Sequence, residues 1–201
     1  MIYRSALFSA LCFFALQAQA VVIDFEPPPC LDCGYGKYSW SEDGFIVSGR
    51  FTHYGSGDWS GDVFSNGSEG AIRTAISTES EVNLAHGAGK LFNITSVEIA
   101  PYSYLYNNAT VTFIGLKANG STVTQTFAHS GSGFAEYIFN PEFSRLQSLS
   151  VARTSSLQGE PIVPLASYDN FNVSAIPLPP AVWLLGSGLL TLAGLRRRRT
   201  A

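Results

Sequence analysis

The stretch Thr110–Ala128 gives the clearest indication of the fold: Thr-Val-Thr-Phe-Ile-Gly-Leu-Lys-Ala-Asn-Gly-Ser-Thr-Val-Thr-Gln-Thr-Phe-Ala. A strand is expected in its first half, Thr110–Leu116, where Val111 and Phe113 alternate with threonine, which places both apolar side chains on one face. A second run of this kind, Thr122–Ala128, follows after Asn119-Gly120, a strong hairpin signal of the type that needs a positive φ. The stretch therefore predicts two antiparallel strands joined by a tight turn.

The same pattern continues through residues 21–175, where short β-branched and aromatic runs alternate with Gly, Ser, Asn and Asp, and helical periodicity is nearly absent. Further strands are expected at Val21–Phe25, Gly44–Phe51, Ala71–Ser77, Phe92–Ala100, Ala135–Phe139, Leu146–Ala152 and Tyr168–Val173. Nine short strands with regular turns predict an all-β domain, an antiparallel, jelly-roll-like β-sandwich. Residues 55–70 and 154–165 are expected to be long loops, because they are rich in small polar residues or proline.

The first 20 residues predict a secretory signal peptide. Arg4 supplies a positive charge, an apolar run follows over 6–16, and Ala18 and Ala20 form an Ala-x-Ala cleavage site. The apolar run is too short for a spanning helix. We expect cleavage after Ala20, and an uncleaved N-terminal anchor is the alternative.

The carboxyl end has the composition of a transmembrane helix. Residues 181–195 carry no charge, and with the preceding prolines the run reaches about 20 residues, enough to cross a bilayer. We expect a helix at about 178–195, followed by the basic anchor Arg196, Arg197, Arg198 and Arg199. The positive-inside rule keeps these arginines in the cytoplasm, so residues 21–175 lie on the periplasmic side, held by membrane lipid around the helix. The alternative, a buried amphipathic helix, fits poorly because the run is apolar on every face.

This order of proline motif, spanning helix and terminal arginines resembles the PEP-CTERM sorting segment of Gram-negative envelope proteins, over residues 176–201. The motif is matched by Ile176, Pro177, Leu178, Pro179 and Pro180. Leu178 replaces the usual glutamate, so the motif is closer to the Val-Pro-Leu-Pro-Ala variety and leaves the peptidase subtype open. The resemblance implies recognition by an exosortase, an integral-membrane peptidase, and delivery to the outer surface or extracellular matrix. It implies no biochemical activity.

Residues 21–175 are acidic. They contain all 15 acidic residues and only seven of the 12 basic ones, which gives a net charge of −8. This charge argues against nucleic acid and anionic lipid as partners of the domain. It is compatible with exposure to solvent and with the binding of divalent cations.

Cys30 and Cys33 form a Cys-x-x-Cys motif, which serves as a redox pair or as half of a zinc site. No second cysteine pair exists and the three histidines are scattered, so a zinc ligand set is not evident. The prolines before the motif and the glycines after it indicate a loop. In an oxidising compartment we expect a local disulfide.

The two ends of the domain resemble the first and last strands of galactose-binding-like and carbohydrate-binding jelly rolls. The similar stretches are Ile-Asp-Phe-Glu at 23–26 and Tyr-Asp-Asn-Phe-Asn-Val at 168–173. The resemblance implies that the terminal strands pair and that nearby carboxylates bind a structural Ca²⁺, with Glu26 and Asp169 as ligands and Asp24 as a further candidate. Hard oxygen ligands suit this cation. The alternative is an Asx turn or a strand cap at Asp169.

Tyr102, Tyr104 and Tyr106 have strand spacing and share one face. If exposed, they form a platform on which sugar rings stack; if buried, they are core residues. Trp40 and Trp59 carry the same two interpretations, and Trp59 is the better candidate for exposure because it lies in a glycine-rich loop.

The sequence contains no catalytic signature. Gly-x-Ser-x-Gly and His-Glu-x-x-His are absent. Glu42 with Asp43, and Asp58 with Asp62, would serve glycoside hydrolysis only at a fixed separation across a cleft. We expect a non-enzymatic envelope protein with a structural or adhesive role at the cell surface or in an exopolysaccharide matrix, where it binds glycan or other envelope proteins. The alternative is a secreted hydrolase of envelope polysaccharide.

Overall fold

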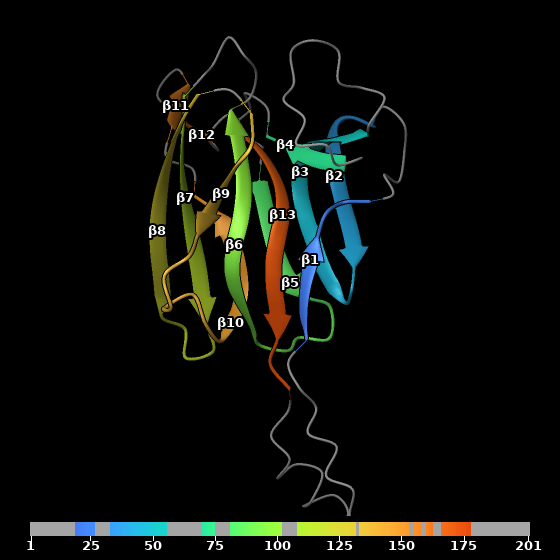
Figure 1. Cartoon of the computed structure of the whole chain (residues 1–201), viewed down its shortest axis with the longest axis vertical. Coiled ribbons are helices and arrows are strands. Elements are labelled where there is room, and N and C mark those ends of the chain that lie inside the picture. Colours follow the sequence, from blue (N-terminus) through green and yellow to red (C-terminus); the bar gives the residue numbers. More distant parts are fainter. Residues whose placement is uncertain are drawn as a thin grey trace, which may run out of the picture. The chain divides into compact units, whose positions relative to one another are not determined.

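The structure is a computed structural model that describes residues 19–26, 33–55, 70–74, 81–101, 108–131, 133–152, 155–157, 160–162 and 166–177. All regular structure in these ranges is β-strand (Figure 1). The strands are β1 (Ala20–Ile23), β2 (Cys33–Glu42), β3 (Phe45–Gly55), β4 (Gly70–Arg73), β5 (Glu81–His86), β6 (Phe92–Pro101), β7 (Asn108–Lys117), β8 (Thr122–Ser130), β9 (Ala135–Ile138), β10 (Leu146–Val151), β11 (Ser155–Leu157), β12 (Glu160–Ile162) and β13 (Ala166–Ala175). The prediction of an all-β domain is confirmed.

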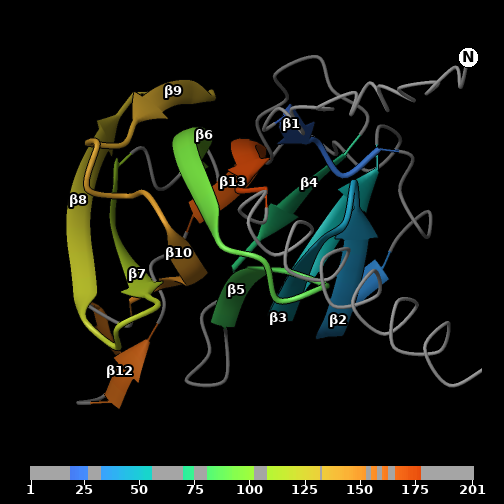
Figure 2. The same cartoon turned by 90° about the horizontal axis from the view of Figure 1, so that it is seen from below.

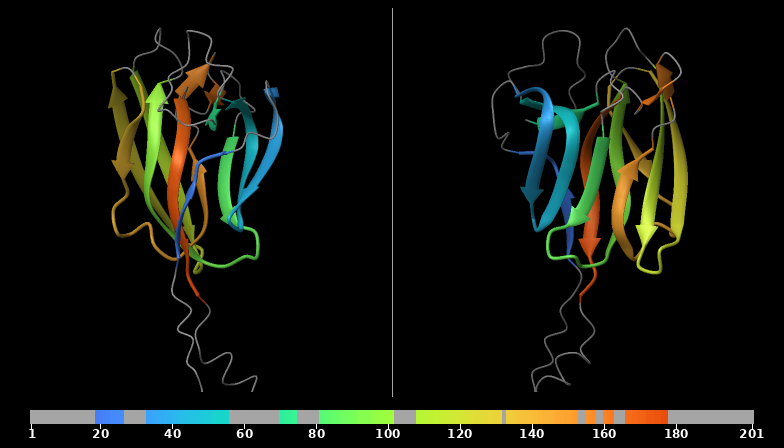
Figure 3. Two further views of the ribbon diagram at one scale, coloured as in Figure 1. Left: turned by 45° about the vertical axis from the view of Figure 1, so that its right-hand side comes forward. Right: turned by 180° about the vertical axis from the view of Figure 1, so that it is seen from behind.

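Eleven of these strands form one antiparallel sheet that folds back on itself. Its order is β8-β7-β10-β5-β3-β4-β13-β6-β9, with β2 added on β3 and β1 added on β13. Two strands that are distant in this order also pair with each other, since Leu146 on β10 lies opposite Phe92 on β6. The result is a sandwich in which β9, β6, β13 and β1 face β7, β10, β5, β3 and β2 (Figures 2 and 3). Residues Gln19–Ile176 form one compact unit.

The stretch Thr110–Ala128 forms the β7–β8 hairpin as predicted. Val111 pairs with Phe127 across the hairpin. In the turn, the Gly120 N–H donates to the Lys117 carbonyl over 2.9 Å, and Gly120 alone of the Asn-Gly pair has a positive φ, 81°. Val111 and Phe113 are completely buried, so the predicted inward face is confirmed.

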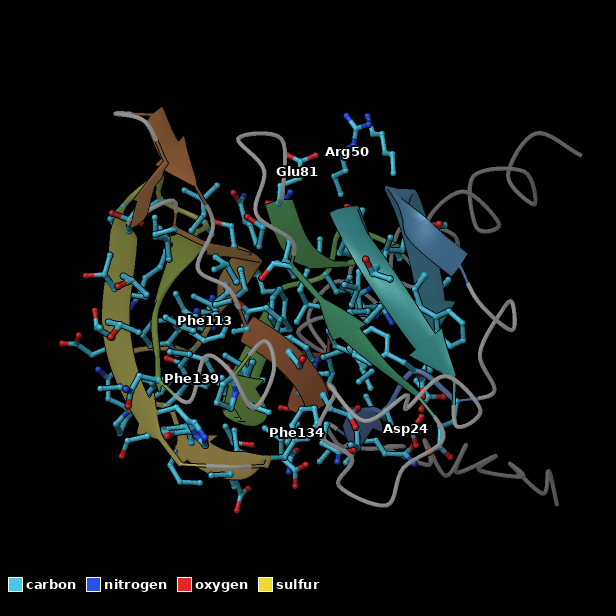
Figure 4. All side chains as sticks on the ribbon, turned by 90° about the horizontal axis from the view of Figure 1, so that it is seen from above. Asp24, Arg50, Glu81, Phe113, Phe134 and Phe139 are labelled. Atoms are coloured by element: carbon cyan, nitrogen blue, oxygen red, sulfur yellow. The ribbon has the colours of Figure 1, made fainter. Side chains whose placement is uncertain are left out.

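Aromatic side chains fill the space between the layers. The largest fully buried ones are Phe25, Phe45, Phe51, Phe92, Phe113, Phe143, Tyr168 and Phe171. Phe113 and Phe139 meet edge to face at 5.2 Å between their ring centroids, and both point into the interior (Figure 4). Edge-to-face contacts of this kind add specific geometry to the burial of apolar area.

All nine expected strands are present, together with four that were not expected from the sequence. The segment after Cys30 was interpreted as a loop, whereas Cys33 begins β2. Strand β5 was not expected either, and the loop expected at 154–165 contains the paired strands β11 and β12. The glycines and serines of β2 hid its period-two pattern, and β11 and β12 have only three residues each.

Several predictions concern residues outside the described ranges. These are the signal peptide with Ala18, the helix at about 178–195, the motif residues Leu178, Pro179 and Pro180, Arg196, Arg197, Arg198 and Arg199, and the side chains of Cys30, Cys33, Trp59, Tyr102, Tyr104 and Tyr106. They stay predictions.

Among the residues that the structure describes, no helix combines the length and the apolar character needed to cross a membrane.

Candidate functional site

The residues that follow β1 meet the last residues of β2. The Phe25 N–H donates to Oε2 of Glu42 over 3.2 Å, and the Trp40 indole Nε1–H donates to the same oxygen over 2.9 Å. The Asp24 carboxyl is a close enough neighbour to raise the pKa of Glu42. We call this group, together with Tyr38, the β1–β2 corner (Asp24, Phe25, Tyr38, Trp40 and Glu42).

A sharp turn of the backbone after β1 creates this corner. Phe25 has a φ of 60°, a left-handed conformation that is unusual for a bulky residue. Its ring is fully buried, 6.1 Å from the Trp40 ring and 6.0 Å from the Phe171 ring. The Glu26 N–H donates to Oδ1 of Asp24 over 3.0 Å, which stabilises the turn. Packing of Phe25 therefore holds the backbone in a strained conformation, a feature that is frequent at binding sites.

Two aromatic side chains of β2 lie beside the carboxyls. Tyr38 and Trp40 are half-buried, and they alternate with the exposed Lys37, Ser39 and Ser41. The Tyr38 ring packs against Phe51 with 5.8 Å between centroids. Each ring thus has one part fixed on the core and another part open to solvent. Trp40 is therefore partly a core residue and partly exposed, so each of the two interpretations from sequence holds for one part of its ring.

The two carboxyls of the corner influence each other. Burial raises the pKa of Glu42, the hydrogen bond from Trp40 opposes this rise, and the neighbouring Asp24 adds to it. The corner therefore concentrates hydrogen-bond acceptors at the edge of an aromatic surface. Asp43, the sequence neighbour considered as a carboxylate partner of Glu42, lies in the β2–β3 turn with a φ of 46°, and the carboxyl that raises the pKa of Glu42 is that of Asp24.

The terminal strands pair, as the jelly-roll resemblance implied, since Ile23 on β1 lies opposite Phe171 on β13. Asp169 is fully buried, and its Oδ1 accepts the Asn170 N–H over 2.8 Å. Asn170 Nδ2 in turn donates to Oε2 of Glu98 on β6 over 3.1 Å. Within the described ranges, no three His, Cys, Asp or Glu side chains are grouped so that they could hold a metal ion. A Ca²⁺ site with Glu26 and Asp169 stays a prediction.

One further signal in the sequence marks the end of β2 at the corner. Asp43-Gly44 is a two-residue hairpin turn in which both residues have positive φ, 46° and 82°. Recognising it predicts a strand that ends at Glu42 and carries Tyr38 and Trp40 on one face. The contact between Glu42 and Asp24 had no sequence signal, because it depends on the long-range placement of β1.

No protein-family model matches the chain. No curated protein matches it either. Among solved structures, a variant of a family 29 carbohydrate-binding module aligns with 12% identity over 80% of this chain and 87% of its own, at a TM-score of 0.38. Another variant, solved in complex with cellulohexaose, gives 12% identity, 80% and 92% coverage and a TM-score of 0.36. The enzymatically active domain of a bacteriophage CBA120 tailspike gives 9% identity, 71% and 19% coverage and a TM-score of 0.30. All three TM-scores are below 0.5, so these likenesses carry no argument about the function of this chain.

Proposed function

We propose that residues 21–175 form a non-catalytic glycan-binding domain whose contact surface is the β1–β2 corner. The observation that carries the proposal is the half-buried Trp40, whose indole Nε1–H is fixed by Glu42 over 2.9 Å. A fixed ring offers an apolar surface to the C–H face of a sugar without loss of rotamer freedom on binding. The Asp24 and Glu42 carboxyls beside it accept hydrogen bonds from sugar hydroxyls.

The geometry of the carboxyls favours binding over hydrolysis. A retaining glycosidase needs its two carboxyl groups about 5–5.5 Å apart, and an inverting enzyme needs more. Asp24 instead acts on Glu42 as an immediate neighbour that raises its pKa, so the pair does not show the separated arrangement of either enzyme class. The alternative of a secreted hydrolase therefore has no support from this pair.

Consecutive strands such as β5 and β6, or β9 and β10, lie in opposite layers (Figure 2). This alternation supports our assignment of the sandwich to the jelly-roll type.

We further propose that the domain is exported and acts at the cell surface or in the exopolysaccharide matrix. Support comes from the Ala-x-Ala site at Ala18 and Ala20 and from the carboxyl segment with its prolines, apolar run and arginines. An exosortase-like peptidase is the proposed processing partner. Cell fractionation tests this step: the protein should leave the membrane fraction only in cells that contain the peptidase. Equal release in cells without it contradicts the proposal.

Binding of purified residues 21–175 to the polysaccharide of the producing cell, measured by calorimetry, tests the glycan proposal. Trp40→Ala should weaken binding at least about tenfold, because truncation of a tryptophan hot spot at a binding surface typically costs about 2 kcal/mol or more. Ile138→Ala is the matched control, since Ile138 is 62% exposed on β9, outside the corner. Equal loss in both variants, or no loss in Trp40→Ala, rejects the corner as the contact surface.

A further inference from the structure

A histidine is buried where the edge strands of the two layers meet. His129 on β8 is only 6% exposed, and its Nδ1 lies 2.9 Å from the hydroxyl of Tyr137 on β9. Its Nε2 is buried without a hydrogen-bond partner in the described part of the chain. Either neutral tautomer leaves this nitrogen unsatisfied, and a protonated ring would bury an unsatisfied donor that carries positive charge.

Among the described strands, β8 and β9 stand at opposite ends of the sheet order and share no backbone pairing. The hydrogen bonds between them all involve a side chain. Gln125 Nε2 donates to the Ile138 carbonyl over 3.1 Å, and the Asn140 N–H donates to Gln125 Oε1 over 2.8 Å. At the other end, the Tyr137 hydroxyl donates to the Ala128 carbonyl over 3.3 Å. We call this junction of Gln125, His129 and Tyr137 the β8–β9 seam.

No charged side chain is placed to stabilise an imidazolium at this position among the described neighbours. The ring of Tyr137 lies 6.0 Å from that of His129, Tyr137 in turn packs on Phe127 at 5.0 Å, and the paired residue on β7 is Ala109. Glu136 is exposed, next to Tyr137 on an alternating strand, so it points to the other face of β9. Burial lowers the pKa of His129. A hydrogen bond with the Gly131 backbone raises it by less, so the pKa stays below its ordinary value.

We infer that the β8–β9 seam is an acid-sensitive latch: protonation of His129 separates its ring from Tyr137 and opens this end of the seam. Gln125 keeps the other end closed. Gly131 and Gly133, both with positive φ, lie between the two strands and allow them to part. Opening gives solvent access to Phe127 and Tyr137, which form an aromatic surface between the layers.

The direction of the effect follows from linkage. The folded-state pKa of His129 lies below the ordinary value of 6.5. The closed seam therefore has its full stability above that value and loses it as the pH falls through the folded-state pKa. Each pKa unit of lowering corresponds to about tenfold in the opening equilibrium.

Amide hydrogen exchange of residues 21–175 at pH 7.5 and pH 5.0, corrected for the intrinsic pH dependence, tests the latch. The backbone of Ala135–Ile138 pairs with β6, so we expect its protection to fall at the lower pH because β9, once released from β8, frays from the sheet edge, while β7 and β10 keep theirs. His129→Gln, which cannot take up a proton, should show no such step. His86→Gln on β5 is the matched control and should behave like the wild type.

Urea unfolding at pH 7.5 shows whether each variant is folded. If His129→Gln proves unfolded, His129→Asn, whose amide can still reach Tyr137, takes its place. The latch is wrong if wild-type β9 keeps its protection at pH 5.0, if the substituted protein retains the step, or if all strands lose protection together.

Discussion

At the residue scale, a few polar side chains have surroundings that shift their pKa, and substitutions at these positions should change the stability of the domain measurably. Glu42 accepts hydrogen bonds from the Phe25 N–H and the Trp40 indole, and it faces Asp24. Its folded-state pKa is raised above 4.5, first by burial and then by Asp24. Its contribution to stability is therefore present below pH 4.5 and is lost as the pH rises through the folded-state pKa.

Glu42→Gln should remove this dependence, because glutamine keeps an oxygen that accepts both hydrogen bonds and carries no charge. We expect the free energy of unfolding of the variant, relative to wild type, to increase from pH 4 to pH 7. Urea titrations across this range measure it, with the exposed Glu142→Gln as the control for loss of one negative charge. A constant difference between Glu42→Gln and wild type would contradict the assigned coupling.

Two tyrosines give opposite expectations for the same chemical change. Tyr168 is fully buried, and its hydroxyl has no hydrogen-bond partner of good geometry among the described residues. Burial raises the pKa of this phenol, and Thr74 offsets the rise only in part. Tyr168→Phe removes an unsatisfied group, whose burial costs about 1–3 kcal/mol, so stability should be unchanged or higher.

Tyr137→Phe, which loses its bonds to His129 and Ala128, should lose about 0.5–1.5 kcal/mol. Thermal unfolding at pH 7.5 compares the two, and the reverse order would show that Tyr168 has a hydrogen-bonded hydroxyl.

At the scale of elements, the sequence predicted strands well where β-branched and aromatic residues alternate. Strand β7 begins within two residues of the prediction and ends one residue beyond it, and the Asn119-Gly120 turn lies where expected. Strand β2 was missed, because glycine and serine interrupt its pattern and the Asp43-Gly44 turn was not recognised. Strand existence depends on local pattern, whereas the partner of each strand depends on contacts distant in sequence.

The β3–β5 pairing requires glycine at one position that no local pattern identifies. A Cβ at Gly49 would collide with the backbone carbonyl of Glu81 on β5, and that carbonyl cannot move without breaking the ladder. At Gly115 on β7, a Cβ would meet only the ends of the Leu146 and Val123 side chains, at 2.8 Å and 2.9 Å.

We therefore expect Gly49→Ala to cost at least about 3 kcal/mol. Gly115→Ala should cost about 1–2 kcal/mol, since those side chains can shift. Denaturant midpoints of the two variants settle the order. Equal costs would mean that β3 and β5 separate easily at Gly49.

At the scale of the whole molecule, the sequence predicted an all-β domain and the pairing of its two terminal strands. It did not predict the site, because the β1–β2 corner joins Asp24 and Glu42 through the packing of Phe25 between Trp40 and Phe171. The aromatic candidates chosen from sequence, Trp59 and the three tyrosines at 102–106, lie outside the described residues. The corner thus comes from tertiary structure, which brings a half-buried tryptophan and two carboxyls together where the residues after β1 meet the end of β2.

Contact between glycan and the β1–β2 corner can be observed in an NMR titration of residues 21–175 with the polysaccharide of the producing cell. This segment contains two tryptophans, Trp40 and Trp59, so each indole N–H signal can be assigned with one substitution. We expect a saturable shift of the Trp40 Nε1–H signal, which Glu42→Gln alters because this carboxyl accepts that hydrogen bond. A titration that saturates while the Trp40 signal stays in place, or that moves the Trp59 signal alone, would contradict it.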